Sequence, residues 1–121
     1  MKDNVIERKS FGFAIRIVRL YRFLCDEKKE YTLAKQLLRC GTSIGANVRE
    51  ALQGYSKKDF VYKMSLALKE ANESLYWIEL LVATETIDQK QGGSLCTDCN
   101  ELISLLVSII KTSKQTLEPN T

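Results

Sequence analysis

Cysteines are the residues of this 121-residue sequence with the clearest capacity for chemistry, because histidine is absent. Cys96 and Cys99 form a C-x-x-C pair, a spacing used for zinc binding and for thiol redox reactions. Zinc needs two further ligands, and Cys25 and Cys40 lack a matching spacing. A redox pair would follow a β-strand, whereas the surroundings here are helical. We favour reduced thiols in or beside a helical core, keep redox sensing and metal binding as alternatives, and predict no metal and no cofactor.

Five polar side chains could gather as an acid and base cluster where two predicted helices meet: Ser43, Asn47, Glu50, Glu70 and Glu73. Carboxylates without a cation, a nucleophile or a glycine-rich loop make a weak catalytic site, and the commonest general base is missing. We therefore predict no catalytic residues, no small-molecule substrate and no enzyme activity. These groups would instead satisfy one another's hydrogen bonds across helices or subunits. A deep pocket around them with a bound ion would favour the enzymatic alternative.

Basic side chains are the strongest indication of a partner. Residues 1–69 hold 15 Lys/Arg and 7 Asp/Glu, a net charge of +8, whereas residues 70–121 hold 3 and 8, a net charge of −5. A basic face could dock subunits head to tail or meet a polyanion such as RNA. The alternative is an ordinary solvated helix exterior. The candidates for nucleic-acid binding, on the outer faces of the first two predicted helices, are Arg16, Arg19, Arg22, Lys35, Arg39 and Arg49.

The elements that must position these residues are amphipathic helices. Apolar residues recur every three to four positions over residues 31–53 and 57–87, which is typical of two helices packed on a core. Between them, Ser56 and Asp59 approximate a capping box that starts the second helix. The first stripe is Leu33, Leu37, Cys40, Ile44, Val48 and Ala51, and the second is Phe60, Met64, Ala67, Ala71, Leu75, Ile78 and Val82.

Two further helices are predicted over about residues 10–26 and 95–115, and the first of them could start as early as Asn4. Helix three is expected to end in a solvated loop that contains Gly92 and Gly93, the only adjacent glycines, and Ser94 is expected to cap the last helix. No alternating β pattern is present. We predict an all-α fold, an antiparallel up-down-up-down four-helix bundle that forms a single domain over residues 1–121.

Two features are not needed by a single bundle and therefore predict assembly: glycines inside a helix and a second apolar face. Gly41 and Gly45 each cost roughly 0.5–1 kcal/mol relative to alanine inside a helix, so something must approach closely enough to use the missing side chains. Helix three carries apolar residues opposite its core stripe, and such patches mark protein interfaces. The interface candidates are Gly41, Ser43, Gly45, Asn47, Glu50, Tyr62, Leu66, Glu70, Glu73 and Trp77.

The run QLLRCGTSIGANVREA, then SKKDF, then LALKEANESLYWIELL, resembles a known family. It is similar to the small bacterial four-helix-bundle proteins encoded in intervening sequences of 23S ribosomal RNA genes, through S-I-G-A-N and K-E-x-x-E-x-x-x-W. The resemblance implies a compact bundle that assembles as a homopentamer, as the accessory protein of diversity-generating retroelements does. One departure is Glu50-Ala51, where many relatives have Glu-Gly. The family's biochemical function is poorly defined.

Taken together, these features predict a non-enzymatic, homo-oligomeric module, a pentamer by the resemblance, that binds structured RNA or another nucleic acid through a basic outer face. The alternative is a structural or adaptor protein that binds a protein partner and has no nucleic-acid role. The N-terminus has no apolar signal region, and no stretch approaches the ~18 uncharged apolar residues of a membrane span. We therefore expect a cytoplasmic protein.

Overall fold

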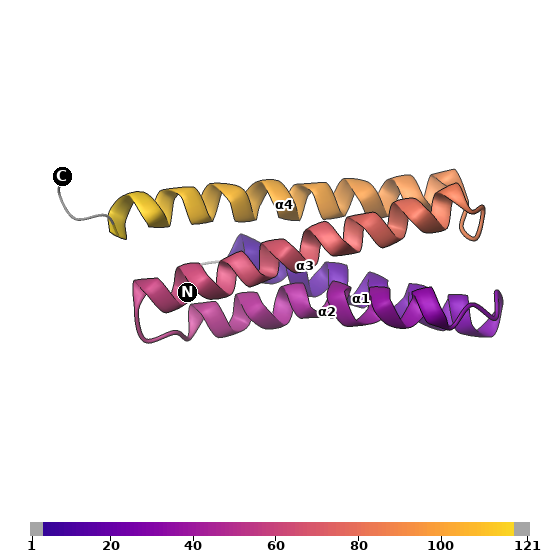
Figure 1. Ribbon diagram of the computed structural model, residues 1–121, viewed down its shortest axis with the longest axis horizontal. Coiled ribbons are helices and arrows are strands. Elements are labelled where there is room, and N and C mark those ends of the chain that lie inside the picture. Colours follow the sequence, from indigo (N-terminus) through magenta and orange to yellow (C-terminus); the bar gives the residue numbers. More distant parts are fainter. Residues whose placement is uncertain (1–3, 118–121) are drawn as a thin grey trace.

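The chain folds into four α-helices joined by short turns (Figure 1). A computed structural model describes residues 4–117, with side chains through residue 115, and within that range no strand occurs. The helices are α1 (Val5–Asp26), α2 (Thr32–Leu52), α3 (Lys57–Ala83) and α4 (Gln89–Leu117). The prediction of an all-α four-helix fold is confirmed.

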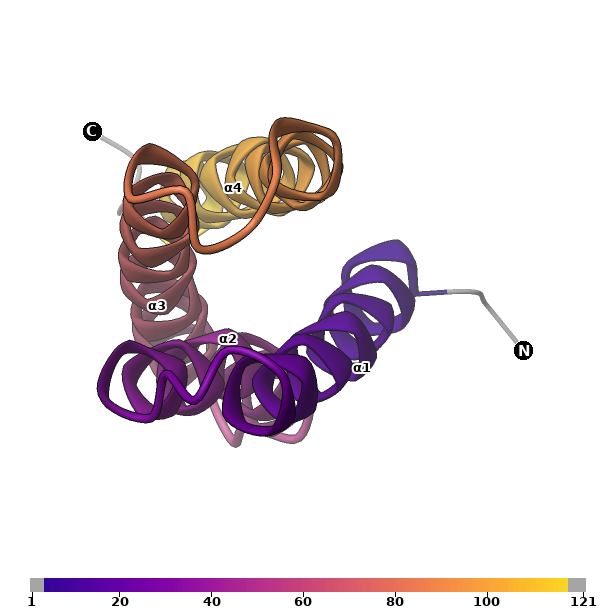
Figure 2. The same ribbon diagram turned by 90° about the vertical axis from the view of Figure 1, so that its right-hand side faces the viewer.

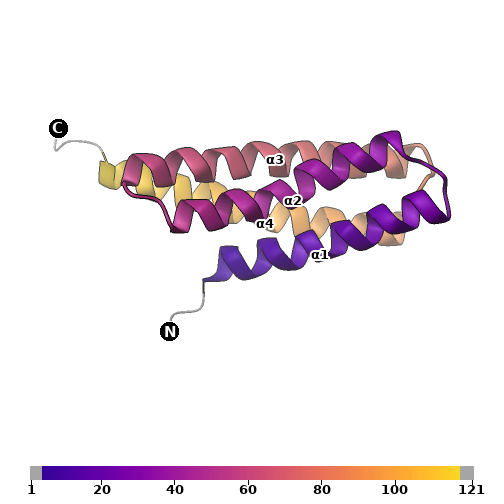
Figure 3. The ribbon, with the colours of Figure 1, turned by 90° about the horizontal axis from the view of Figure 1, so that it is seen from below.

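Successive helices run in opposite directions, because the three turns lie at alternating ends of the long axis (Figure 1). Viewed end-on, the order around the bundle is α1, α2, α3 and α4 (Figure 2). Helix α1 packs much less extensively on α4 than on α2, and the view from below shows α1 passing in front of α4 (Figure 3). The seam between the first and last helices is therefore the loosest of the four.

Helix α1 starts at Val5, which agrees with the earlier of the two predicted starts and not with residue 10. Asn4 is its N-cap, and the Asn4 side chain accepts a hydrogen bond of 3.0 Å from the Glu7 backbone N–H. An asparagine at this position satisfies a backbone donor that the first turn leaves unpaired. The core face of α1 has helical spacing, and Tyr21 at its border is half-buried. Its buried residues are Ile6, Ser10, Phe13, Ile17, Leu20 and Leu24.

The hairpin of α2 and α3 follows the predicted pattern closely. Ser56 caps α3, and its hydroxyl accepts from the Asp59 N–H at 3.0 Å. Helix α3 ends at Ala83, four residues before the predicted end. Glu85 has a left-handed φ of 60°, and the backbone N–H groups of residues 84–87 turn back onto the carbonyls of the last helical turn. A left-handed residue just past the last turn is a common helix terminator.

Helix α4 begins six residues before the predicted start. Asp88 accepts from the Gln91 N–H at 2.7 Å, so the cap is Asp88 and not Ser94. The prediction of a loop through Gly92 and Gly93 is wrong, because both glycines are helical. Gly92 is buried, and a Cβ there would collide with Val82 Cγ2. The absent side chain lets the start of α4 approach the end of α3.

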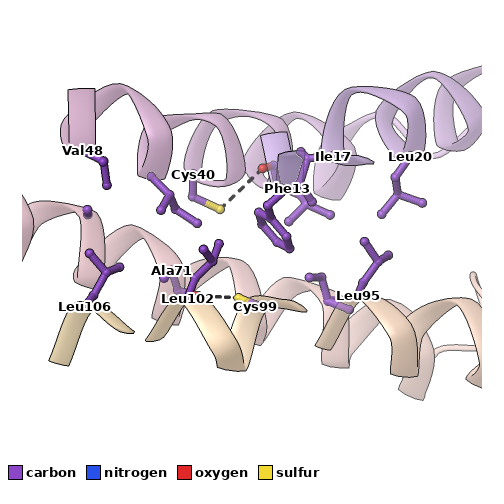
Figure 4. Packing of buried hydrophobic residues seen from close by; sticks show 14 of the residues in the cluster. Phe13, Ile17, Leu20, Cys40, Val48, Ala71, Leu95, Cys99, Leu102 and Leu106 are labelled. Atoms are coloured by element: carbon purple, nitrogen blue, oxygen red, sulfur yellow. Dashed lines mark hydrogen bonds between the residues drawn. The ribbon is translucent and has the colours of Figure 1, made fainter. Parts of the chain in front are cut away.

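The core runs the length of the bundle between the two helical hairpins. Side chains from α1 and α2 face those of α3 and α4 across it, with Phe13, Ile17 and Leu20 opposite Leu95 and its neighbours (Figure 4). Met64, Ile78 and Leu106 are fully buried. Burial of such side chains contributes about 1.5–3 kcal/mol each, which makes this core the main source of stability.

Helix α4 meets a looser criterion for a membrane span, one that tolerates charged residues. Its segment Gln89–Gln115 is long and apolar enough to cross a membrane by length and composition. Such a segment is weak evidence of a span, because core helices of bundles satisfy the same criterion. Here the apolar positions recur with helical spacing: Leu95, Cys99, Leu102, Leu106 and Ile110 are buried in the core, while Thr97, Ser104 and Ser108 are exposed.

Candidate nucleic-acid interface

The basic side chains of α1 that face α4 form ion pairs with it. Arg16 donates to Asp98 Oδ2 at 2.6 Å and to Ser94 Oγ at 3.1 Å. About two turns earlier in α1, Lys9 Nζ lies 2.8 Å from Glu101 Oε2. The basic N-terminal half and the acidic C-terminal half of the sequence thus partly neutralise each other within one chain.

A groove follows this α1–α4 seam. It consists of two adjoining hollows, one of about 380 Å³ and one of about 240 Å³, and Arg16 lines both. The larger hollow is lined by Arg8, Lys9, Gly12, Phe13, Arg16, Asp98, Glu101 and Leu102. The smaller is lined by Arg16, Arg19, Leu20, Phe23, Gln91 and Leu95. Apolar residues that line the groove belong mostly to the core, whereas its charged residues lie nearer the surface.

Two of the predicted RNA-binding arginines instead hold neighbouring helices together. Arg39 of α2 forms ion pairs with Glu70, at 3.2 Å, and with Glu73 of α3. Glu73 also accepts from Trp77 Nε1 at 3.0 Å. The sequence predicts that Glu70 and Glu73 bond with Ser43, Asn47 and Glu50, whereas here they bond with Arg39 and Trp77 of the same chain.

Arg49 of α2 has a similar role beside α1. Its Nε lies 3.5 Å from Glu7 Oε2, and its guanidinium lies 5.6 Å from the centre of the Phe11 ring. Stacking of this type is worth about 0.5–1 kcal/mol at an exposed site. Arg49 therefore has two partners within its own chain.

The other three basic candidates are exposed. Within the described part of the chain, no ion pair joins Arg19, Arg22 or Lys35 to an acidic residue. Arg19 lies in the α1–α4 groove beside Arg16. Arg22 and Lys35 line neither hollow of the groove. The structure therefore brings together Arg16 and Arg19 out of the six predicted residues.

The glycines predicted at an interface contact α1 of the same chain. A Cβ on Gly41 would lie 2.8 Å from Ile17 Cγ1, and one on Gly45 would lie 3.4 Å from the Ser10 carbonyl oxygen. Close approach at Gly41 is thus needed by α1. At Gly45 the space would accept a methyl group in ordinary contact.

Some of the remaining interface candidates bond within their own chain, and others lie at or near the surface. Ser43 and Asn47 donate to carbonyls one turn earlier in α2, at 2.6 Å and 2.9 Å. Glu50 pairs with Lys63 of α3 at 2.8 Å. Tyr62 is 58% exposed, while Leu66 and Trp77 are half-buried. Assembly through this surface stays a prediction.

Sequence reasoning missed an exposed apolar row on α1. Val5, Phe11 and Ile15 are 41%, 54% and 39% exposed. Phe11 also lines a separate groove of about 400 Å³ between α1 and α2, together with Glu7, Ala14, Thr42, Gly45, Ala46, Arg49 and Glu50. The signal was present for Phe11 and Ile15, because helical spacing places them on the face of α1 opposite Ile17 and Leu20.

The C-x-x-C pair has the properties of core thiols. Burial raises the pKa of Cys99 to about 12, and its Sγ donates to the Ala71 carbonyl at 3.2 Å (Figure 4). Burial also raises the pKa of Cys96 and of Cys40. These thiols are neutral at physiological pH, so the thiolate that redox exchange or zinc binding requires is not favoured. Among residues 4–117, no group of three potential ligands is placed to hold a metal ion.

Comparison with known proteins agrees with this fold. The model of the 23S rRNA-intervening sequence protein family matches residues 2–108. The chain belongs to this family. A crystal structure of a protein of unknown function from the S23 ribosomal protein family of Bacteroides thetaiotaomicron is 55% identical, over 88% of this chain and 98% of that chain, with a TM-score of 0.87. Comparison with curated proteins gives no match.

Proposed function

We propose that this 23S rRNA-intervening sequence protein is a non-enzymatic, homo-oligomeric module of the cytoplasm that binds structured RNA through its basic surface. The observation that carries the proposal is the exposure of Arg19, Arg22 and Lys35 without an acidic partner in the described chain. Exposed cations of this kind bind phosphates and release counterions, which drives association with nucleic acid.

Assembly would multiply this surface. The exposed apolar residues Phe11, Ile15, Tyr62, Tyr76 and Val107 offer more contact area than one chain covers. A homopentamer, which the family resemblance implies, would have a mass of about five times 13.8 kDa. Light scattering at micromolar concentration is the direct measurement, and a monomeric mass would refute the assembly.

RNA binding is tested by fluorescence polarisation with a labelled RNA hairpin that carries an unpaired loop. The intact oligomer should bind at low salt, and its affinity should fall steeply as salt rises. The slope of log affinity against log salt concentration, here called the salt slope, should be about −0.7 to −0.9 per phosphate contact. The triple variant Arg19→Gln, Arg22→Gln, Lys35→Gln should lose most of this affinity. Absence of binding by the wild-type protein at low salt would reject the proposal.

A control variant should separate local contacts from net charge. Asn72→Glu, Asn100→Glu and Ser108→Glu add three negative charges at exposed positions of α3 and α4, so its net charge equals that of the triple glutamine variant. We expect this control to lose much less affinity. An equal loss in both variants would mean that only the overall charge matters.

A protein-binding adaptor is the second candidate, and the apolar groove between α1 and α2 favours it. Phe11 and Ala14 on one side and Ala46 on the other offer a surface that an amphipathic helix of a partner could cover. A partner captured from nuclease-treated lysate, and lost on Phe11→Ser substitution, would support this function. Capture that depends on intact RNA would favour the first proposal.

A further inference from the structure

The α1–α4 groove has basic residues on one side and acidic residues on the other. Arg8, Lys9, Arg16 and Arg19 come from α1, whereas Asp98 and Glu101 come from α4. Eleven residues separate the first and last of these cations, which corresponds to about 16 Å along the helix axis. The row of cations therefore runs the length of the groove.

The acidic residues of the groove accept hydrogen bonds from its cations, as an external anion would. Asp98 accepts one guanidinium N–H of Arg16 at 2.6 Å, and Glu101 accepts from Lys9 at 2.8 Å. Phosphate oxygens use the same donors in the same kind of charge-assisted hydrogen bond. These pairs are partly exposed, with side-chain exposures of 34% for Arg16 and 45% for Asp98. An exposed pair of this kind is worth only about 0–1 kcal/mol, so an incoming phosphate can displace the carboxylate.

Loose packing also makes this seam a better binding site than the other helix–helix seams. Helix α1 packs less extensively on α4 than on α2, and Gly12, which lines the groove, has no atom within 4 Å of the place a Cβ would take. The groove therefore has open space beside its cations. Proteins that bind single strands combine a cationic groove with aromatic rings on which bases stack. Phe23, half-buried at one end of the groove, supplies such a ring.

We propose that the α1–α4 groove binds the phosphodiester backbone of an unpaired RNA strand, and that Asp98 and Glu101 are internal competitors that hold Arg16 and Lys9 until RNA displaces them. This inference rests on the proposed RNA-binding function and specifies its site. It predicts that removing an acidic residue from the groove strengthens binding.

The first experiment compares two matched neutral variants of acidic residues. Asp98→Asn releases Arg16, and Glu50→Gln releases Lys63 from an ion pair of 2.8 Å between α2 and α3. Each variant raises the charge of the chain by one. With a labelled single-stranded RNA of about 20 nucleotides, Asp98→Asn should raise affinity up to about fivefold, the equivalent of one exposed ion pair. Because Arg16 contacts a phosphate in both complexes, the slope of log affinity against log salt should change by much less than the ~0.7 that a whole phosphate contact contributes.

Glu50→Gln should leave the affinity for the single strand nearly unchanged. Equal effects of the two variants, or no effect of Asp98→Asn, would overturn the assignment of the groove. Circular dichroism checks that both variants keep the helical fold.

The second experiment uses two arginines of α1 that are one turn apart. Arg19 lines the groove and Arg22 does not, although both are exposed. With the single strand, Arg19→Gln should make the salt slope shallower by about 0.7 per protomer in contact. Arg22 lies outside the groove and contributes to binding of the hairpin, so Arg22→Gln should change the single-strand slope little. An equal loss from both would indicate a diffuse basic surface and contradict the groove.

The failures of the two proposals are distinguishable. If the wild-type protein binds neither the hairpin nor the single strand at low salt, RNA binding itself is wrong. If it binds the hairpin while the groove variants behave as their controls, the function stands and the groove assignment fails.

Discussion

Helix α1 packs on α2 through apolar and small side chains, whereas it reaches α4 mainly through charged ones. On the α2 side, Ile17 is fully buried and lies against Gly41. On the α4 side, Arg16 and Lys9 hold Asp98 and Glu101 across a groove. The α1–α2 seam is held by close packing of buried side chains, and the α1–α4 seam is crossed by ion pairs that an anion can displace. The difference teaches that the same helix can supply stability with one side and a binding surface with the other.

The largest expected effect comes from the tight side. Ile17→Ala should lower the free energy of unfolding by about 2–5 kcal/mol, because a cavity forms where Ile17 meets α2. Ile15→Ala, on the exposed face of the same helix, should change it by less than about 0.5 kcal/mol. Urea unfolding followed by circular dichroism measures both. Similar losses would mean that α1 is not seated as described.

Unfolding at alkaline pH tests whether water is excluded from the interface between α4 and α3. The pKa of Cys99 is raised by burial to about 12 from 9.0, so between these values the unfolded chain has lost a proton that the folded chain keeps. Stability contributed by the buried thiol is complete below pH 9 and falls as the pH rises toward 12. The slope for one thiol reaches about −1.4 kcal/mol per pH unit. Cys99→Ala should unfold with a shallower pH dependence, and an unchanged dependence would mean that water reaches this thiol.

Glycine substitutions should have opposite signs on the two sides of α1. Gly41→Ala should cost about 1–2 kcal/mol, because overpacking against Ile17 exceeds the gain in helix propensity. Gly12→Ala in the open groove should stabilise by about 0.5–1 kcal/mol. Thermal unfolding of the two single variants gives the comparison. Destabilisation by Gly12→Ala would contradict the open space beside Gly12 in the α1–α4 seam.

The smallest stability effect is expected for the charged seam. Asp98→Asn should lower the free energy of unfolding by less than about 1 kcal/mol, and this difference should vanish at 1 M salt because partly exposed pairs are screened. Unfolding at two salt concentrations measures it. A loss that exceeds 2 kcal/mol and persists in salt would make Asp98 a structural residue and not a displaceable competitor.

The sequence predicted what depends on helical periodicity. Ile17, Ile44 and Ile78 recur at helical spacing on their helices, so their burial could be predicted without knowing which helices are neighbours. The start of α4 was predicted six residues late, because a glycine pair is typical of loops. Only the contact of Gly92 with Val82, a tertiary feature, explains why glycine is used inside that helix.

Pairing of charges was beyond prediction from one sequence. Arg16 and Asp98 are 82 residues apart in sequence, and their contact depends on the rotation and relative height of α1 and α4. Six basic residues looked equivalent because all lie outside the core stripe. The structure separates two groups by their ion pairs within the described residues. Arg16, Arg39 and Arg49 pair with acidic residues of neighbouring helices, whereas Arg19, Arg22 and Lys35 do not.

Two lysines allow the central comparison to be measured directly. Lys9 in the α1–α4 groove and Lys63 between α2 and α3 each pair with a glutamate at 2.8 Å, and their side chains are 32% and 28% exposed. Acetylation of each lysine, followed by mass spectrometry with and without saturating single-stranded RNA, compares them in one sample. We expect RNA to slow acetylation of Lys9 and to leave Lys63 unchanged. Equal protection of both lysines, or protection of Lys63 alone, would contradict the account.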